Sequence, residues 1–389
     1  MSNILFLYEN NSPSAELTKR HYEMWKELCS PDSNIVYRSD ASLTSFDLNW
    51  ADVLIVIRGL SPYEKSICEL AKRRNIFVVL HIDDDMLNPP EGYIQLKQRT
   101  KSLKRIIEIS DAVVTNPYLK QKYENINNSK RVILTDTPVK EENIVYKTGS
   151  NKIKMVYPAG KDHAILFERI LVPAFEKLPE ECAKKISIDF IGNKPKVDTL
   201  KNIETNFIEH MSMENYEKHM AKSDYDIGLA PLEISEFNKG KYYNKYISFA
   251  KYGIVGIYTN MEPYNYIIKD KENGVLCNNT PESWIATISD LIFDKSIIEE
   301  MRAHSYNDLK ERFSPKTIIT KYDSDLPELN SHKSNDIKVN IVVKKLIRIC
   351  FSIREKLYFL FKHLKKDGIK STINRIFKHV KLKRDYGEL

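Results

Sequence analysis

The sequence predicts two doubly wound α/β domains in tandem, followed by a basic helical tail. Short apolar strands alternate with amphipathic helical stretches through the first 140 residues, and the same alternation restarts at residue 153. Strands that are apolar on both faces and separated by helices belong to parallel sheets covered on both sides. A chain of 389 residues also exceeds what one hydrophobic core usually organises. We expect domains at 1–145 and 153–325 and a tail at 338–389.

Six strands are predicted in the first domain, with helical stretches between them around residues 14–29, 61–73, 93–108 and 117–123. This order is typical of a Rossmann-like sheet. The strands are ILFLY (4–8), NIVYRS (34–39), VLIVIRG (53–59), IFVVLHID (76–83), AVVTN (112–116) and VILTD (132–136).

The second domain repeats this architecture without repeating the sequence. A polar stretch, KEENIVYKTGSNK at 140–152, separates it from the first domain. One helix start is well marked, because Thr280 suits an N-cap and Pro281 suits the first helical position. The predicted strands are IKMVYPA, SIDFIG, NFIEH, YDIGLAPL, VGIYTN and GVLCN, each followed by a helix candidate.

Charge sets the tail apart from the rest of the chain. The net charge is +7, and the residues from Lys333 onward are strongly basic, whereas the body is slightly acidic. A polar linker, YDSDLPELNSHKSNDIK at 322–338, precedes the tail. Beyond it the pattern predicts an amphipathic basic helix that ends near Gly368, with a second short helix after it. The apolar positions are Val342, Leu346, Ile349, Ile353, Leu357, Leu360 and Leu364.

Several protein classes do not fit the composition. Five scattered cysteines, without a CxxC pair or a histidine at metal-ligand spacing, indicate a reduced protein without structural zinc. The start MSNILFLYENN lacks the basic region of a signal peptide, and no run of 18 apolar residues occurs. Neither GxGxxG nor GxxxxGK[ST] is present, which argues against a dinucleotide-binding dehydrogenase and a P-loop NTPase. We expect a cytoplasmic protein.

Open α/β sheets bind ligands at the carboxyl ends of their strands, so three loops are candidates. The strand at 225–232 leads into FNKGKYYNKYISFAKYG at 237–253. Lys241 and Lys245 are four residues apart, so they share a face once the helix has begun. A helix N-terminus with lysines suits a diphosphate. Alternatively, these lysines form a solvated helix face and the interleaved tyrosines are packing residues.

The other two loops carry different chemistry. HIDDD at 81–85 places carboxylates at a strand end, where they can hold a divalent metal, act as a base or accept hydrogen bonds from sugar hydroxyls. Alternatively, Asp83 or Asp84 caps the following turn. PAGKDH at 158–163 offers a glycine for close backbone approach, together with a lysine and a histidine at a helix start. The histidine can equally be an ordinary residue of the first helical turn.

These motifs, in this order, resemble the glycosyltransferases of the GT-B fold. The resemblance is to family 4 (glycosyl transferases group 1) and its relatives in bacterial capsule, O-antigen and surface polysaccharide assembly, and it covers residues 1–325. It rests on DIGLAPLEISEFNKGKYYNKYISFAKYGI, on ENGVLCNNTPESWIATISDLIFD, and on the early IDDD with SDAVVTNPYLKQKY.

The resemblance implies two Rossmann-like domains facing across a cleft, with a nucleotide-sugar donor held mainly by the second domain and the acceptor by the first. It implies no cofactor and no obligatory metal. The donor-binding residues that it implies are Gly160, Lys161, His163, Asn238, Lys241 and Lys245; the catalytic ones, near the transferred sugar or the acceptor hydroxyl, are His81, Asp83 and Asp84.

One position departs from the family pattern. Family 4 enzymes typically carry two glutamates eight positions apart, the second of which binds the ribose. Here the second place falls on Ser248 and the first on Gly240. We include Ser248 among the donor-binding residues, with an altered ribose contact or an altered activity as the consequence.

Our prediction is a glycosyltransferase that moves a sugar from a nucleotide-diphosphate donor to a growing bacterial surface glycan or a lipid-linked acceptor. Retention of anomeric configuration is expected from the resemblance. The tail at 338–389 suits an anionic membrane surface on the inner face of the cell membrane; alternatively, it packs on the body or on a partner. An acidic body does not favour nucleic acid. The alternatives are a metal-dependent single-Rossmann transferase and a catalytically silent GT-B subunit that binds a partner glycosyltransferase.

Overall fold

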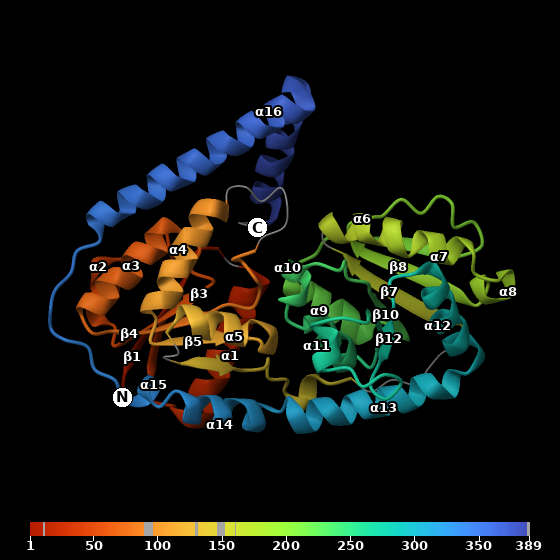
Figure 1. Ribbon diagram of the computed structural model, residues 1–389, viewed down its shortest axis with the longest axis horizontal. Helices are drawn as coiled ribbons and strands as arrows, with labels where there is room; N and C mark the ends of the chain where they lie inside the picture. Colours follow the sequence, from red (N-terminus) through yellow and green to blue (C-terminus); the bar gives the residue numbers. More distant parts are fainter. Residues whose placement is uncertain (11, 89–95, 129–130, 146–151, 160, 387–389) are drawn as a thin grey trace. The chain divides into compact units, whose positions relative to one another are not determined.

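The structure is a computed structural model that describes residues 1–10, 12–88, 96–128, 131–145, 152–159 and 161–386 (Figure 1). The chain forms two compact units. Unit 1 comprises Met1–Thr137 and Ile319–Leu389, and unit 2 comprises Pro138–Ile318. Unit 1 is therefore built from both ends of the chain, with unit 2 inserted between them.

Unit 1 contains a six-stranded parallel sheet with the order β2-β1-β3-β4-β5-β6. The predicted strands of this domain are confirmed, and β3 and β4 are buried along their whole length because helices cover both faces. The strands are β1 (Asn3–Tyr8), β2 (Asn34–Ser39), β3 (Val53–Ile57), β4 (Phe77–His81), β5 (Ala112–Thr115) and β6 (Val132–Leu134).

Helices connect these strands, and three of them begin with the same local signal. A serine or asparagine caps the first turn with its side chain, and a proline follows at the first helical position, at Ser12, Ser61 and Asn116. The helices are α1 (Pro13–Cys29), α2 (Ser45–Trp50), α3 (Pro62–Arg73), α4 (Leu96–Ile109) and α5 (Pro117–Ile126).

Unit 2 contains a second six-stranded parallel sheet, with the order β12-β11-β10-β7-β8-β9. This is the strand order of a doubly wound Rossmann-like domain. Its strands are β7 (Ile153–Ala159), β8 (Ile186–Gly192), β9 (Glu204–Glu209), β10 (Ile227–Ala230), β11 (Val255–Thr259) and β12 (Val275–Cys277).

The helices of unit 2 include the one predicted to start at Thr280. Its hydroxyl accepts a hydrogen bond from the Ser283 amide, as expected of an N-cap. The helices are α6 (Lys161–Ile170), α7 (Val172–Glu176), α8 (Glu180–Ala183), α9 (Met213–Lys222), α10 (Glu236–Lys239), α11 (Asn244–Lys251), α12 (Pro281–Phe293) and α13 (Lys295–Arg312), with 3-10 turns η1 (Glu141–Asn143) and η2 (Tyr264–Tyr266).

Two further helices, α14 (Pro315–Asp325) and α15 (Glu328–Ser331), follow unit 2. From Ile319 onward their apolar side chains pack in the core of unit 1 with residues of β1 and β3. The sequence grouped residues up to 325 with the second domain. The structure assigns Ile319–Asp325 to unit 1 because Tyr322 and Leu326 are buried there.

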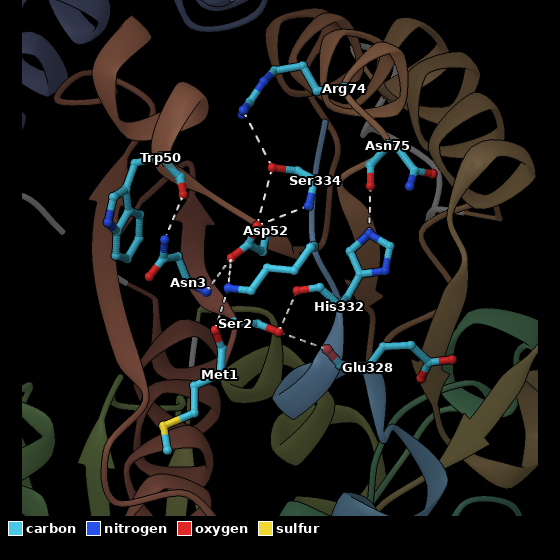
Figure 2. A network of polar contacts seen from close by, with 11 residues as sticks. Met1, Ser2, Asn3, Trp50, Asp52, Arg74, Asn75, Glu328, His332 and Ser334 are labelled. Atoms are coloured by element: carbon cyan, nitrogen blue, oxygen red, sulfur yellow. Dashed lines mark hydrogen bonds and ion pairs between the residues drawn. The ribbon is translucent and has the colours of Figure 1, made fainter. Parts of the chain in front are cut away.

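Residues 332–341 run along unit 1 as a strap, although their polar composition predicts a linker (Figure 2). Asp52 accepts hydrogen bonds from the Ser334 amide at 3.0 Å and from Lys333 Nζ at 2.9 Å. The buried Arg74 donates to the carbonyls of Asn335 at 3.0 Å and Ile337 at 2.6 Å. Ile341, at the end of the strap, is buried in the core of unit 1, with Val339 packed against the same cluster. The rest of the strap is held by its backbone and polar groups, which leave no apolar periodicity in the sequence.

The tail forms α16 (Val342–Tyr386), which starts beside α3. The predicted break is confirmed, because Gly368 adopts φ +75° inside this element, a conformation that interrupts a helix and favours glycine. Among the described residues, no helix combines the length and the apolar character needed to cross a membrane.

Candidate functional site

Each sheet reverses its strand order once, and several of the predicted site residues lie near these two places. The reversal falls between β7 and β10 in unit 2 and between β1 and β3 in unit 1. Ligands of open α/β sheets bind outside the carboxyl ends of the strands at such a reversal. We call these places the unit 2 edge and the unit 1 edge.

At the unit 2 edge, packing of α11 on the sheet positions Lys245. Phe249 of α11 covers Gly228 of β10 so closely that a Cβ at Gly228 would lie 2.4 Å from the ring. The Lys245 amine lies 5.8 Å from the centre of the Phe249 ring. It donates a hydrogen bond of 2.8 Å to the carbonyl of Pro158, near the end of β7. The amine is therefore held at the strand reversal itself.

The electrostatic environment of Lys245 favours an anion. Burial, together with the positive charge of Lys241, lowers the pKa of Lys245 to about 8. Among the described residues no carboxylate forms an ion pair with its amine. An amine that is partly removed from water without a counter-ion gains free energy when an anion binds.

The other lysines of this segment behave differently. Lys239 pairs with Glu236 at 2.8 Å, and Lys251 pairs with Glu217 at 3.2 Å. Both lysines are therefore already paired with carboxylates, and the side chain of Lys251 is largely shielded from solvent. Lys241 lies before α11 rather than on it, yet it is close enough to Lys245 to affect the pKa of that amine.

Backbone groups complete the unit 2 edge. The N-cap of α11, Tyr243, gives the first turn no side-chain hydrogen bond, and its carbonyl accepts one from the Tyr246 amide at 3.0 Å. The amides of Asn244 and Lys245, at the start of the helix, are therefore the ones that an anion can meet. Gly192 has φ +99° and approaches the end of β7 so closely that a Cβ there would lie 2.7 Å from the Ala159 carbonyl oxygen. Asn193 donates two hydrogen bonds of 3.2 Å to the same carbonyl. We did not predict Asn193 from the sequence. The glycine before it, at the end of an apolar strand, is the signal that could have pointed to this close approach.

The remaining predicted donor residues are placed as follows. Asn238 donates from its amide to the Glu233 carbonyl at 2.8 Å, within its own loop. The Ser248 hydroxyl lies 3.4 Å from the Tyr216 hydroxyl on α9, one turn along α11 from Lys245. Gly160 lies outside the described residues. Lys161 begins α6, and the side chains of Lys161 and His163 also lie outside what is described.

The unit 1 edge is organised around Arg58, which sequence reasoning missed. Its Nη2 donates to Asp84 at 3.0 Å and to the Ser14 hydroxyl at 2.9 Å, and its Nε lies 3.4 Å from Asp83. Ser14 in turn donates to Asp83 at 2.7 Å. The structure therefore brings Asp83 and Asp84 together around one guanidinium group.

The backbone of Arg58 is unusual for a large side chain. Its φ is +64°, in the left-handed region, and its amide donates to the His81 carbonyl at 2.7 Å. Such a conformation costs free energy and often accompanies functional sites. An Arg-Gly pair directly after the buried strand VLIVI is the signal that could have identified it.

His81 lies apart from the two aspartates, with its ring in the core. Its Nε2 is 3.0 Å from the Tyr22 hydroxyl and 2.9 Å from the Tyr322 hydroxyl. Burial, with a further contribution from His21, holds the pKa of His81 well below its usual range, so the ring is neutral. These contacts are those of a core histidine, and its proposed catalytic role stays a prediction.

The third aspartate of HIDDD, Asp85, does not share the arginine that binds Asp83 and Asp84. Asp85 is buried and binds Lys122 Nζ with both oxygens, at 2.6 and 2.7 Å. Within the described part of the chain, no group of three or more His, Cys, Asp or Glu residues is arranged to hold a metal ion. Arg58 thus engages the carboxylates of Asp83 and Asp84, and Lys122 engages that of Asp85.

No protein-family model matches the chain, and no curated protein matches it in sequence. Solved structures match its fold. HepE from Anabaena, in complex with UDP and glucose, superimposes with a TM-score of 0.63 at 12% identity, covering 84% of this chain and 100% of that one. Sucrose-phosphate synthase from Thermosynechococcus elongatus gives 0.64 at 10% identity, covering 85% and 99%.

An alpha-glucosyltransferase in complex with UDP and a 13-mer DNA gives a TM-score of 0.58 at 11% identity, covering 83% of this chain and 99% of that one. At such identities the likeness concerns the fold. It confirms the predicted architecture of two Rossmann-like domains, the GT-B fold.

Proposed function

We propose that this protein is a glycosyltransferase that moves a sugar from a nucleotide-diphosphate sugar to an acceptor hydroxyl. The observation that carries the proposal is the Lys245 amine at the strand reversal of unit 2, without a described carboxylate partner. The structural matches support it, because HepE and the alpha-glucosyltransferase were both solved with UDP.

In the proposed reaction the bond between the anomeric carbon and the diphosphate oxygen breaks, and the acceptor oxygen bonds to that carbon. The acceptor proton leaves with the departing diphosphate or with a nearby base. Negative charge grows on the diphosphate as it departs, and preorganised cations and helix amides lower the barrier by stabilising it. Lys245, Lys241 and the first amides of α11 are the described groups at this edge that supply such stabilisation. The proposal includes no metal and no cofactor.

The acceptor side of the proposal is the unit 1 edge. Asp83 and Asp84, held by Arg58, would accept hydrogen bonds from hydroxyls of the acceptor or of the transferred sugar. We further propose, from the family resemblance, that the acceptor is a growing bacterial surface glycan or a lipid-linked glycan and that anomeric configuration is retained. The basic tail supports work at the inner face of the cell membrane.

Calorimetric titration with UDP, GDP and their sugars tests the donor half of the proposal. We expect at least one nucleotide to bind at pH 7. Its affinity should fall above pH 8, by up to about tenfold per pH unit, because Lys245 must be protonated to hold the diphosphate. The variant Lys245→Arg should bind the nucleotide as tightly at pH 9 as at pH 7. If no nucleotide binds a protein whose thermal unfolding shows it to be folded, the transferase proposal is wrong.

One observation favours a second candidate, a catalytically silent subunit that binds a partner glycosyltransferase. Ser248 stands where the family resemblance places the ribose-binding glutamate, and its hydroxyl lies near Tyr216. This candidate predicts that the full chain neither hydrolyses nor transfers any of a panel of nucleotide sugars, even where one binds. Turnover of any nucleotide sugar would exclude it.

A further inference from the structure

The first half of α16 packs on unit 1 through its charged side. Glu355 pairs with Arg99 of α4, with Nε to Oε1 at 2.7 Å and Nη2 to Oε2 at 2.8 Å. Arg99 also binds Glu9, directly after β1, at 2.6 and 2.8 Å. The ring of Phe351 lies 5.2 Å from the Arg99 guanidinium carbon. We call this set the Arg99 latch.

Arg348 points in the same direction, one turn before Phe351. Its Nε is buried, and its positive charge acts on Asp40, which follows β2. Burial and the neighbouring Glu64 and Glu9 raise the pKa of Asp40, and Arg348 opposes that rise. The inward side of the helix therefore meets acidic side chains at the carboxyl ends of β1 and β2.

The opposite side of this segment is apolar and faces outward. A helix on a soluble protein normally does the reverse and buries its apolar side. A contiguous exposed row of this kind marks a surface that binds something. The row, which we call the apolar row, comprises Val342 (63% exposed), Val343 (71%), Leu346 (59%), Ile349 (45%), Ile353 (53%), Leu357 (48%) and Phe361 (65%).

This arrangement argues against one of the alternatives that the sequence leaves open for the tail, packing of its apolar side on the body. In the interpretation of a helix packed on the body, the apolar row would be covered by unit 1. Here the latch holds the polar side, and the row stays exposed along the described helix. The row therefore calls for a partner outside this chain.

Charge identifies the partner. The sequence of α16 contains 14 Lys and Arg and three Asp and Glu, and one of those acids, Glu355, is already bound by Arg99. Exposed cations such as Arg354 and Lys356 alternate with the apolar row. An apolar stripe bordered by cations fits the interface of an anionic bilayer, where acyl chains take the apolar groups and lipid phosphates take the cations.

We propose that the apolar row of α16 binds an anionic lipid bilayer and that the Arg99 latch holds this helix in a fixed orientation on unit 1. The latch reaches Glu9 at the carboxyl end of β1, so the membrane is fixed relative to the edge that carries Ser14, Asp83 and Asp84. The reason for this docking, access to a lipid-linked acceptor, rests on the proposed function, whereas the binding itself does not.

The test is co-sedimentation of the full chain with vesicles of phosphatidylcholine alone or mixed with phosphatidylglycerol. We expect binding to the anionic vesicles, weakened by salt because the lipid charges are screened. Leu346→Asp and Ile353→Asp should each reduce binding about tenfold or more, because a carboxylate would enter the interface. Phe293→Asp is the matched control, since Phe293 is 60% exposed on α12 and should bind as wild type.

Three outcomes would overturn the membrane proposal. The first is equal binding of the wild type to neutral and anionic vesicles. The second is binding by both aspartate variants that is as strong as that of the wild type. The third is a full chain that binds no vesicles but forms a dimer, which Leu346→Asp dissociates. The last would assign the row to a second copy of this chain. Vesicle binding by a chain that binds no nucleotide would leave this inference standing and remove only the proposed function.

A separate experiment tests whether the Arg99 latch holds α16 on unit 1. In Arg99→Gln, vesicle binding should persist, while amide hydrogen exchange of residues 348–358 in the free protein should become faster, because the helix loses its ionic hold on unit 1. Exchange at the wild-type rate would show that Arg99 does not fix the helix. Circular dichroism confirms in each variant that the chain is folded.

Discussion

The unit 1 edge and the unit 2 edge share a topology and differ in their chemistry. Both lie at the strand reversal of a six-stranded parallel sheet. At the unit 2 edge a lysine amine is held by a carbonyl and has no described carboxylate partner. At the unit 1 edge, two aspartates are matched by one arginine. The reversal thus determines where a ligand can bind, and the side chains determine which ligand.

The difference also separates an edge with an uncompensated charge from one whose charges are paired. Lys245 remains partly desolvated and close to a second positive charge until an anion arrives. Asp83 and Asp84 already have their counter-ion, so they offer fixed acceptors for hydroxyl groups without a large change on binding. The following predictions test this contrast, from the largest expected effect to the smallest.

Lys245→Met should reduce the affinity for the nucleotide that binds in calorimetry by about 10- to 100-fold, because a hydrogen bond to a charged group is worth about 1.5–3 kcal/mol. The free variant should be at least as stable to heat as wild type, since a desolvated amine is removed. Unchanged affinity would show that the unit 2 edge is not the anion site, and the contrast between the edges would fail.

Arg58→Met should lower the free energy of unfolding in urea by about 1–3 kcal/mol, because it leaves two half-buried carboxylates side by side without a cation. Nucleotide affinity should not change, since Arg58 belongs to unit 1. Arg105→Met is the control, an exposed arginine paired with Glu69 at 3.6 Å, with an expected change below about 0.5 kcal/mol. A parallel loss of nucleotide affinity in Arg58→Met would contradict the division of roles.

The contribution of each buried histidine to the free energy of unfolding should fall as the pH drops below about 6.5, by up to about 1.4 kcal/mol per pH unit. Burial lowers the pKa of His21 to about 3 in the folded chain, so the unfolded chain binds more protons between these values. Urea unfolding at pH 7, 6 and 5 measures the slope, and His21→Leu should flatten it. The difference in slope between wild type and His21→Leu isolates the contribution of His21. Glu64, whose raised pKa is about 8, instead makes the folded chain more stable as the pH falls.

The smallest effect is expected for Lys239→Ala. Its amine is already paired with Glu236 at 2.8 Å, so nucleotide affinity should change by less than about twofold. Calorimetry of both variants compares two lysines six residues apart, one at the end of α10 and one in the first turn of α11. A loss as large as that of Lys245→Met would mean that the whole lysine cluster, rather than the amine at the strand reversal, binds the anion.

The sheets could be predicted closely because their strands are buried on both faces, which leaves short β-branched runs such as VLIVI in the sequence. The strap at residues 332–341 could not be predicted in this way. It is held by Asp52 and Arg74, which are distant in sequence and bind backbone groups, and such contacts leave no periodic pattern. Polar composition alone then indicates a linker.

The candidate site shows the same division. The four-residue spacing of Lys241 and Lys245 predicted a shared helix face, whereas Lys241 precedes α11 and acts on Lys245 through its charge. Their role in donor binding stays a prediction. The pairing of Lys251 with Glu217 could not be predicted, because Glu217 comes from another helix, whereas Glu236 lies only three residues before its partner Lys239. The Arg-Gly pair after VLIVI marks the position of Arg58, but its ion pairs with Asp83 and Asp84 join residues about 25 positions apart along the chain, which leave no pattern in the sequence.

The insertion of unit 2 between the two segments of unit 1 determines the order in which the chain folds during its synthesis. Tyr322, Leu326 and Leu329 complete the core that β1 and β3 begin, and they leave the ribosome only after Ile318, the last residue of unit 2. Domains fold as units once their residues have been translated. Unit 2 is therefore finished first, while the earlier strands of unit 1 wait for the C-terminal segment with their apolar face open to chaperones.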